Sequence, residues 1–343
     1  MFAPSRLRLA RARLGLTRTK LVQLSGISLR TLTEYENEER APSDENIVRL
    51  ARALSVPRSF FDRDEIEPVP VEAASFRKLS KASATRRDAV LANAALTLEF
   101  FELLEQHFKL PIPVIPTLDK HGPARAADLV RHQWALGDRP ISNMLHLLES
   151  KGVRVTSLNQ DFGDIDAFCF YRDAAPYVFL NTSKSAERQR FDLAHELGHL
   201  VLHSDTEMDT ASSKEREAQA NEFAANFLMP ASAVRQHSMS GASISRILTA
   251  RSYWRVSAMA MTHRLHELHL LTDWQYRSTC MTLSERGFRR EEPGGITPET
   301  SQLLRKVLYG STARISFKAA ANELDLNPSE IRSYARDLVP MGT

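Results

Sequence analysis

Residues 191–203 read FDLAHELGHLVLH, and within them His195, Glu196 and His199 form the pattern His-Glu-x-x-His. Residues four apart lie on the same face of an α-helix, so the imidazoles of His195 and His199 can share one metal ion. Glu196 would then lie at the edge of the site, where its carboxylate can accept a proton from an attacking water. The pattern fixes only three positions, so a plain helix with two surface histidines is the alternative interpretation.

The residues around the motif favour the metal site. They are apolar nearly all round the helix, namely Leu193, Ala194, Leu197, Leu200, Val201 and Leu202. Such a helix is expected to be buried. Two histidines and a glutamate in a buried helix need polar partners, because unpaired polar groups are costly there. A metal ion would be such a partner.

A catalytic zinc site needs a third protein ligand and leaves its fourth position open. The next helical stretch, residues 215–230, reads EREAQANEFAANFLMP. At helical pitch its polar residues Glu215, Gln219, Glu222 and Asn226 fall on one face. Glu217 falls on the opposite, apolar face, which predicts that it is the third ligand. The alternative is a carboxylate paired with a buried arginine, and His203 or Glu222 would then be the next candidates for the ligand.

The two segments HELGHLVLH (195–203) and EAQANEFAANFLMP (217–230) together resemble the ImmA/IrrE zinc metallopeptidases. The resemblance implies that His195, His199 and Glu217 bind one Zn²⁺ per chain and that Glu196 is the general base. His203 lies about 80° round the helix from His195, which makes it a poor third ligand. We expect His203 and Asn221 to act as supporting residues next to the ligands, and His203 could also contact the transition state.

The chain has 343 residues and a formal net charge of +3, but the charge is unevenly distributed. Residues 1–33 contain no acid and carry seven basic residues, namely Arg6, Arg8, Arg11, Arg13, Arg18, Lys20 and Arg30. A basic block on a nearly neutral chain is typical of a nucleic-acid contact. A solvated helix face would normally alternate basic and acidic residues.

Residues 5–61 are predicted to form four or five short helices, with Thr17 and Ser28 as N-caps. The segment LTRTKLVQLSGISLRTLTEYENEERAPS (16–43) resembles the Xre/Cro-type helix-turn-helix domains of phage repressors. Two positions depart from that family, which usually has Gln in place of Arg18 and Gly in place of Glu38. Glu38 must therefore adopt a left-handed conformation or alter the turn.

The resemblance places the start of the recognition helix at Ser28, Leu29, Arg30 and Thr31. Arg30 could bind guanine through two hydrogen bonds. Arg18, Lys20 and Arg40 are expected to contact phosphates, which add affinity without sequence information.

The middle of the chain is predicted to mix helices and strands. Acids followed by two prolines indicate a linker at 67–76, and long apolar periodicity indicates a helix at 84–108. Strands are expected at 153–158, 167–171 and 177–181 in an antiparallel sheet. By resemblance to zinc peptidases, the last of them is a candidate substrate-binding edge, comprising Tyr177, Val178, Phe179, Leu180 and Asn181; an ordinary core strand is the alternative.

The fold class expected for the whole chain is multidomain and helix-rich α+β. It comprises an all-α helix-turn-helix head (1–66), the linker (67–76), a zincin-like peptidase domain with a small antiparallel sheet (77–235), and a helical C-terminal extension (236–343). Within the extension, residues 291–295 (EEPGG) indicate a second linker, and the tail has a weak helix-turn-helix pattern.

The composition of the chain indicates where in the cell the protein is expected to lie and in which redox state its cysteines are. The sequence shows no apolar run of the ~20 residues that a membrane helix needs and no signal-peptide pattern, so we expect a cytoplasmic location and no membrane partner. Cys169 and Cys280 form no Cys-x-x-Cys pair and are expected to be reduced. The sequence leaves monomer and homodimer open.

The leading hypothesis is a DNA-binding transcriptional regulator with a zinc-dependent endopeptidase domain. The resemblance implies that its partners are a double-stranded DNA operator and a protein substrate, a helix-turn-helix repressor whose cleavage releases stress or mobile-element genes. One alternative is a regulator without proteolysis, whose zinc domain is a sensor or a structural brace. Another makes the head a docking module for a repressor of like fold.

Overall fold

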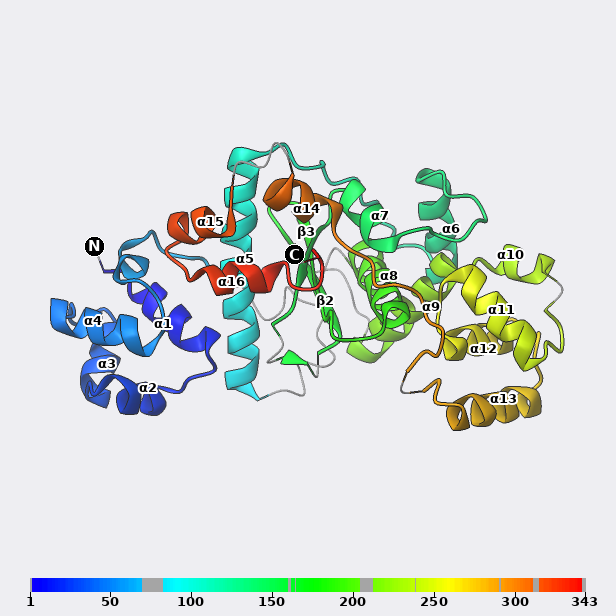
Figure 1. The fold of residues 1–343 in the computed structure, drawn as a ribbon, viewed down its shortest axis with the longest axis horizontal. Helices are drawn as coiled ribbons and strands as arrows, with labels where there is room; N and C mark the ends of the chain where they lie inside the picture. The colour runs from blue at the N-terminus through cyan, green and yellow to red at the C-terminus, as the bar shows by residue number, and fades with distance from the viewer. Residues whose placement is uncertain are drawn as a thin grey trace. The chain divides into compact units, whose positions relative to one another are not determined.

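The computed structural model describes residues 2–69, 83–159, 162–163, 165–203, 212–237, 239–289, 291–310 and 315–340. The chain divides into two compact units, and Figure 1 labels their helices and strands. The first comprises residues 1–110 together with 303–339, and the second comprises residues 111–302 and the last four residues. In the described part of the chain, no helix is both long enough and apolar enough to cross a membrane.

The N-terminal head is built from short capped helices, as the sequence predicts. They are α1 (Pro4–Arg13), α2 (Arg18–Ser25), α3 (Leu29–Glu36), α4 (Asp44–Ala53) and the 3-10 helix η1 (Arg58–Asp62). The Thr17 hydroxyl accepts the backbone N–H of Lys20 and begins α2, and Ser28 caps α3 in the same way. Glu38 adopts φ +68°, so the chain keeps the turn after α3 by placing a non-glycine residue in the left-handed region.

The rest of the first unit comes from two distant parts of the chain. It contains the long helix α5 (Ala84–His107) and the C-terminal helices α14 (Gln302–Tyr309), α15 (Phe317–Glu323) and α16 (Pro328–Tyr334). Glu330 of α16 forms an ion pair with Arg13 of α1, and the Asn327 amide donates to the Ser55 carbonyl at 2.6 Å. The C-terminal helices therefore complete the head, a packing that differs from the consecutive segments expected from the sequence. Most of the expected linker 67–76 lies outside the described residues.

The second unit surrounds a small sheet with helices. The elements are α6 (Pro123–Gln133), α7 (Met144–Ser150), β1 (Arg154–Ser157), β2 (Ala167–Arg172), β3 (Ala175–Leu180), α8 (Ala186–Leu202), α9 (Ser213–Leu228), α10 (Ala231–Gln236), α11 (Ile244–Trp254), α12 (Ala258–Glu267) and α13 (Asp273–Glu285). Helices α8 and α9 pack against each other, and α8 also contacts β2 and β3 (Figure 1). The helix-rich α+β class predicted from the sequence is confirmed.

The sheet differs from the expected antiparallel arrangement. Its strand order is β1-β3-β2, with β2 antiparallel to β3 but β1 parallel to β3. β2 follows β1 in the chain but pairs with the far side of β3, so β3 can run beside β1 in the same direction. The candidate substrate edge at 177–181 is consequently wrong, because β3 is the central strand and its backbone is hydrogen-bonded on both sides.

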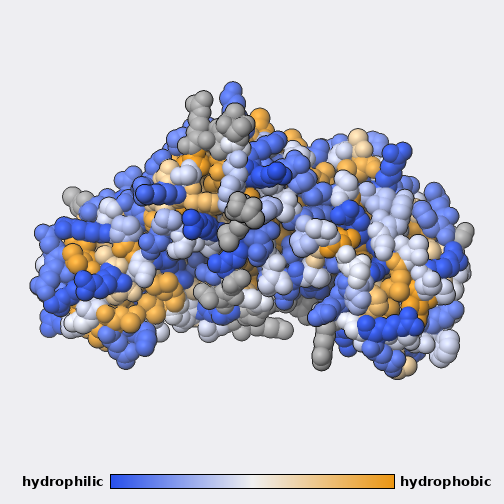
Figure 2. Space-filling model, in the orientation of Figure 1, coloured by the Kyte–Doolittle hydropathy of each residue, from blue (hydrophilic) through white to orange (hydrophobic). Residues whose placement is uncertain are grey.

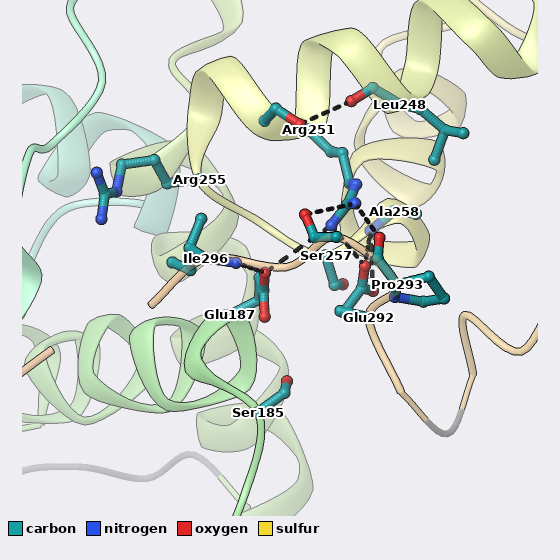
Figure 3. A network of polar contacts seen from close by, with 12 residues as sticks. Ser185, Glu187, Leu248, Arg251, Arg255, Ser257, Ala258, Glu292, Pro293 and Ile296 are labelled. Carbon is teal, nitrogen blue, oxygen red and sulfur yellow. Dashed lines mark hydrogen bonds and ion pairs between the residues drawn. The ribbon is translucent and has the colours of Figure 1, made fainter. Parts of the chain in front are cut away.

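The segment predicted as a linker at 291–295 is anchored to the second unit (Figure 3). The carboxylate of Glu292, whose side chain is 5% exposed, accepts a hydrogen bond from Arg251 of α11 at 3.0 Å. It also accepts the backbone N–H of Ala258 at 3.1 Å, at the start of α12. Further on, the N–H of Ile296 donates to Glu187 in the first turn of α8 at 2.7 Å. Arg251 thus lies between two carboxylates, those of Glu187 and Glu292.

Residues near 299 continue this attachment. Glu299 accepts the backbone N–H groups of Met144 and Leu145 at 2.8 and 3.0 Å, which have no partner within α7 because they lie in its first turn. Glu299 also forms an ion pair with the buried Arg190 of α8. The segment 291–302 is therefore a strap that joins the N-terminal turns of α7, α8 and α12.

Burial raises the pKa of Glu292 from its ordinary value of 4.5 to about 7. The folded protein then binds this proton more tightly than the unfolded chain does, so the stabilising contribution is complete at low pH and is lost as the pH rises through about 7. We predict that Glu292→Gln flattens the pH dependence of the denaturant midpoint between about pH 5 and about pH 8. The exposed neighbour provides the control, Glu291→Gln, which should keep the wild-type profile. Parallel profiles for wild type and Glu292→Gln would contradict the prediction.

Candidate metal centre

Helix α8 begins at a strong cap and buries most of its surface. The Ser185 hydroxyl accepts the backbone N–H of Arg188 at 3.3 Å, and Glu187 lies in the first turn. The apolar residues expected to surround the motif are buried, including Leu193, Ala194 and Leu197. The prediction of a buried helix is confirmed.

Helix α9 approaches α8 closely because α8 carries a glycine at the contact. A Cβ atom built on Gly198 would lie 3.1 Å from Phe223 Cδ1 and 3.2 Å from Ala220 Cα, closer than most real Cβ contacts. Glycine in a helix interior costs about 1 kcal/mol relative to alanine, so its presence here serves the approach of the two helices. The capping box of Ser212 and Glu215 begins α9.

The close approach brings three predicted ligands together. His195 Nε2 and His199 Nε2 lie 3.1 Å apart, and the carboxylate oxygens of Glu217 lie 3.7 Å and 3.5 Å from these two nitrogens. In the described part of the chain, these three residues form the one group of histidine, cysteine or acidic side chains arranged to hold a metal ion. A tetrahedral Zn²⁺ with ligand distances of about 2.0–2.1 Å needs ligand atoms roughly 3.3–3.4 Å apart. The observed separations lie on both sides of that value, so the three residues fit the ion.

The protonation of His195 also suits a ligand. Its Nδ1 lies 3.1 Å from Asn221 Oδ1, and since an amide oxygen only accepts, Nδ1 carries the hydrogen and Nε2 keeps its lone pair. Burial, followed by the neighbouring His199, lowers the pKa of His195 to about 4. A neutral imidazole whose free lone pair faces a second imidazole and a carboxylate is the arrangement that a cation requires.

The remaining predicted residues take different places. Glu196 follows His195 on α8 and is 3% exposed, and the Cys169 thiol of β2 donates to its backbone carbonyl at 3.4 Å. His203 lies next to His199, with their Nδ1 atoms 3.0 Å apart, and does not belong to the group of three ligands. Gln219, which the sequence places on the polar face of α9, contacts His203. Nothing in the helical periodicity of α9 predicts this contact, because it depends on where the C-terminal end of α8 lies.

The basic block of the head is neutralised by acids from later in the chain. Every arginine within residues 2–33 has a carboxylate partner: Arg6 with Glu99, Arg8 with Glu38, Arg11 and Arg18 with Glu36, Arg13 with Glu330, and Arg30 with Glu34. Lys20 hydrogen-bonds Gln23 at 3.2 Å. The local excess of positive charge is therefore smaller than the sequence of residues 1–33 suggests.

The start of α3 is exposed, as expected for a recognition helix. The side chain of Arg30 is 90% exposed and that of Arg40 is 62% exposed, and both lie near Glu34. Ser28 caps the helix, and its hydroxyl lies 2.8 Å from that of Thr31. The head also exposes large apolar side chains, and apolar surface is visible in this region among the charged residues in Figure 2. These apolar residues are Leu14, Leu24, Leu29 and Val48.

Comparison with known protein families agrees with the fold and the site. Residues 7–61 match the helix-turn-helix family, and residues 148–266 match the peptidase family described as the IrrE N-terminal-like domain. The chain therefore joins a DNA-binding type of domain to a metallopeptidase-like domain. More particularly, it has the architecture of an Xre-type helix-turn-helix followed by an ImmA/IrrE-type domain, as the sequence motifs predict. No curated protein matches the chain.

We predict that wild type binds about one Zn²⁺ per chain and that Glu217→Ala binds much less, because a catalytic site uses three protein ligands. Metal content after exhaustive dialysis, measured by atomic absorption, tests this. Glu222→Ala is the matched control, since Glu222 is exposed on the same helix and is not in the group of three. Unchanged stoichiometry in Glu217→Ala would mean that another residue is the third ligand.

Proposed function

We propose that the protein is a transcriptional regulator of the cytoplasm whose second unit is a zinc-dependent endopeptidase. The observation that carries the proposal is the group of His195, His199 and Glu217, with ligand atoms spaced as a tetrahedral ion requires and with Glu196 next to the first ligand. A closed structural zinc site usually has four protein ligands, whereas three leave a position for the reacting groups.

The roles of the residues follow from their chemistry. His195, His199 and Glu217 would hold the ion, which polarises a peptide carbonyl and lowers the pKa of water when bound. Glu196 accepts a proton from the water whose oxygen attacks the carbonyl carbon. As the carbon–nitrogen bond breaks, Glu196 passes that proton to the leaving amine, so the carboxylate is regenerated. Asn221 keeps the Nδ1 hydrogen of His195 directed away from the site.

The proposed substrate is a protein, and the resemblance to ImmA/IrrE peptidases favours a helix-turn-helix repressor. The head would hold the peptidase close to DNA on which such a repressor is bound, which raises the effective concentration of the two proteins. With β3 in the middle of the sheet, the backbone edges left for an extended substrate within the described residues are those of β1 and β2. Of these, β2 packs against α8, and its Cys169 contacts the backbone of Glu196.

We predict that Glu196→Gln keeps zinc, fold and DNA binding but loses peptidase activity, because glutamine cannot accept the proton of water. Purified wild type and variant would be incubated with a helix-turn-helix repressor encoded by a neighbouring gene and analysed by gel and mass spectrometry. In cells, newly formed protein N-termini would be compared between the two strains, with the exposed-site variant Glu222→Gln as the control.

The same comparison of wild type with Glu196→Gln tests the alternative, a regulator that acts without proteolysis. If Glu196→Gln controls the target genes as well as wild type does, and no N-terminus depends on Glu196, proteolysis is not the mechanism. The metal site would then act as a sensor or a brace.

The exposed leucines and the paired arginines of the head favour a second candidate, in which the head docks onto a protein instead of DNA. The proposal of DNA binding assigns phosphate contacts to Arg18, Lys20 and Arg40 and base contacts to the segment Ser28–Thr31. Lys20 offers a clean test, whereas the Nε of Arg18 donates to the buried Glu36 at 2.6 Å and its replacement would also disturb the head.

For DNA binding, Lys20→Ala should weaken affinity for all duplexes and reduce the salt dependence by about one unit. Arg30→Ala should cost ~1–3 kcal/mol mainly on the preferred operator, because base contacts discriminate between sequences. Titrations against operator and random duplexes at several salt concentrations measure both. Equal losses of affinity on the two duplexes for Arg30→Ala would show that Arg30 does not recognise bases. If wild type bound neither duplex, the result would favour the head as a protein-docking module.

A further inference from the structure

Three polar side chains form a series at the C-terminal end of α8. His199 Nδ1 lies 3.0 Å from His203 Nδ1, and His203 Nε2 lies 2.7 Å from Gln219 Oε1 on α9. The series therefore begins at a proposed metal ligand, passes through the residue that caps α8, and ends on the helix that supplies Glu217.

The chemistry of these atoms determines where the hydrogens lie. An amide oxygen can only accept, so His203 Nε2 must carry the hydrogen of that bond. A neutral imidazole with its hydrogen on Nε2 has a lone pair on Nδ1, which then accepts the hydrogen of His199 Nδ1. His199 Nε2 is left with its lone pair, and this is the atom that faces His195 and Glu217.

We propose that Gln219, acting through His203, is a positioning residue that fixes the tautomer and ring orientation of His199 for metal binding. The inference rests on the metal site of the proposed function. It assigns His203 a supporting role, because both of its ring nitrogens are engaged within this series. Neither nitrogen is then available to bind the metal or to stabilise a transition state.

The two ligand histidines differ in how they are supported. His195 uses Asn221, an exposed residue, directly. His199 is more deeply buried, at 5% exposure, and reaches its supporting amide through a second imidazole. Partners of ligand histidines fix the tautomer and typically change metal affinity by about 10–100-fold when removed. Gln219 should therefore affect the affinity for the metal, although it reaches the ligand His199 only through His203.

The first test replaces the accepting amide while keeping its length. Gln219→Met should weaken Zn²⁺ affinity by about 10–100-fold, measured by competition with a chromophoric chelator. Gln133→Met is the matched control, because Gln133 is exposed at the end of α6 in the same unit, and it should bind as wild type does. Thermal unfolding of the metal-free proteins checks that the variants fold, and Gln219→Ala replaces the methionine variant if the longer side chain disturbs packing.

A double-mutant cycle shows whether the two residues act in series. His203→Ala removes the acceptor for His199, so adding Gln219→Met to it should cause no further loss of affinity. Independent structural effects would instead add. Additive losses in the double variant would overturn the proposal, and so would wild-type affinity in Gln219→Met.

A third measurement does not depend on the metal. In the metal-free protein at neutral pH, ¹⁵N-resolved imidazole spectra should show His203 with its hydrogen on Nε2 and His199 with its hydrogen on Nδ1. Gln219→Met should change the tautomer of both rings, and an unchanged tautomer pattern would overturn the relay. If wild type binds no Zn²⁺, the proposed function fails, while the spectra still decide the relay on their own.

Discussion

The close packing of α8 against α9 is the contact on which the candidate site depends. Gly198 permits it, because any larger residue would meet the side chain of Phe223 and the backbone of Ala220. The two histidines are brought together within one helix by their spacing, but Glu217 reaches them only because the second helix lies this close. The same approach places Asn221 and Gln219 where they can support the histidine rings. One small residue thus sets both the ligands and their supporting contacts.

Several charged side chains of this protein are buried and paired with one another. Glu36 is 1% exposed and accepts hydrogen bonds from both Arg11 and Arg18. This buried acid of α3 therefore compensates arginines of an N-terminal segment that has no acid of its own. In the second unit, Arg251 lies between Glu187 and Glu292, and Arg190 meets Glu299. Buried charges of this kind need their partners, because a single unpaired charge in the interior is strongly destabilising. These ion pairs join segments that lie far apart in the chain.

Local patterns in the sequence predicted most elements and the group of ligands. Helix periodicity and capping residues depend on neighbours in the chain, so the helices of the head, the extent of α5 and the presence of α8 and α9 follow from them. The spacing of His195 and His199 and the unusual position of Glu217 have the same local character. The parallel pairing of β1 with β3 could not be read in this way, since strand order depends on how the chain returns to the sheet.

The contacts that sequence patterns missed all join residues far apart in the chain. The acids that neutralise the basic block include Glu99 and Glu330, and no window of sequence shows that they return to residues 6 and 13. Proline and glycines at 293–295 suggested a free linker, yet Glu292 beside them is fixed by a buried arginine. Gln219 was placed on the polar face of its helix, and the sequence of that helix alone does not show its contact with His203. In each case the partner lies more than a dozen residues away.

The strap and the C-terminal helices make the peptidase-like segment an insertion within the unit that contains the helix-turn-helix domain. The chain leaves the first unit near residue 110 and rejoins it near residue 303, so residues 111–302 are joined to the first unit at both of their ends. A domain that is inserted at both ends is not released by one backbone cleavage, because the other connection still joins it to the first unit. At the C-terminal connection, α16 is bound to α1 through the ion pair of Arg13 and Glu330. Exchange of such an inserted domain during evolution requires two breakpoints instead of one.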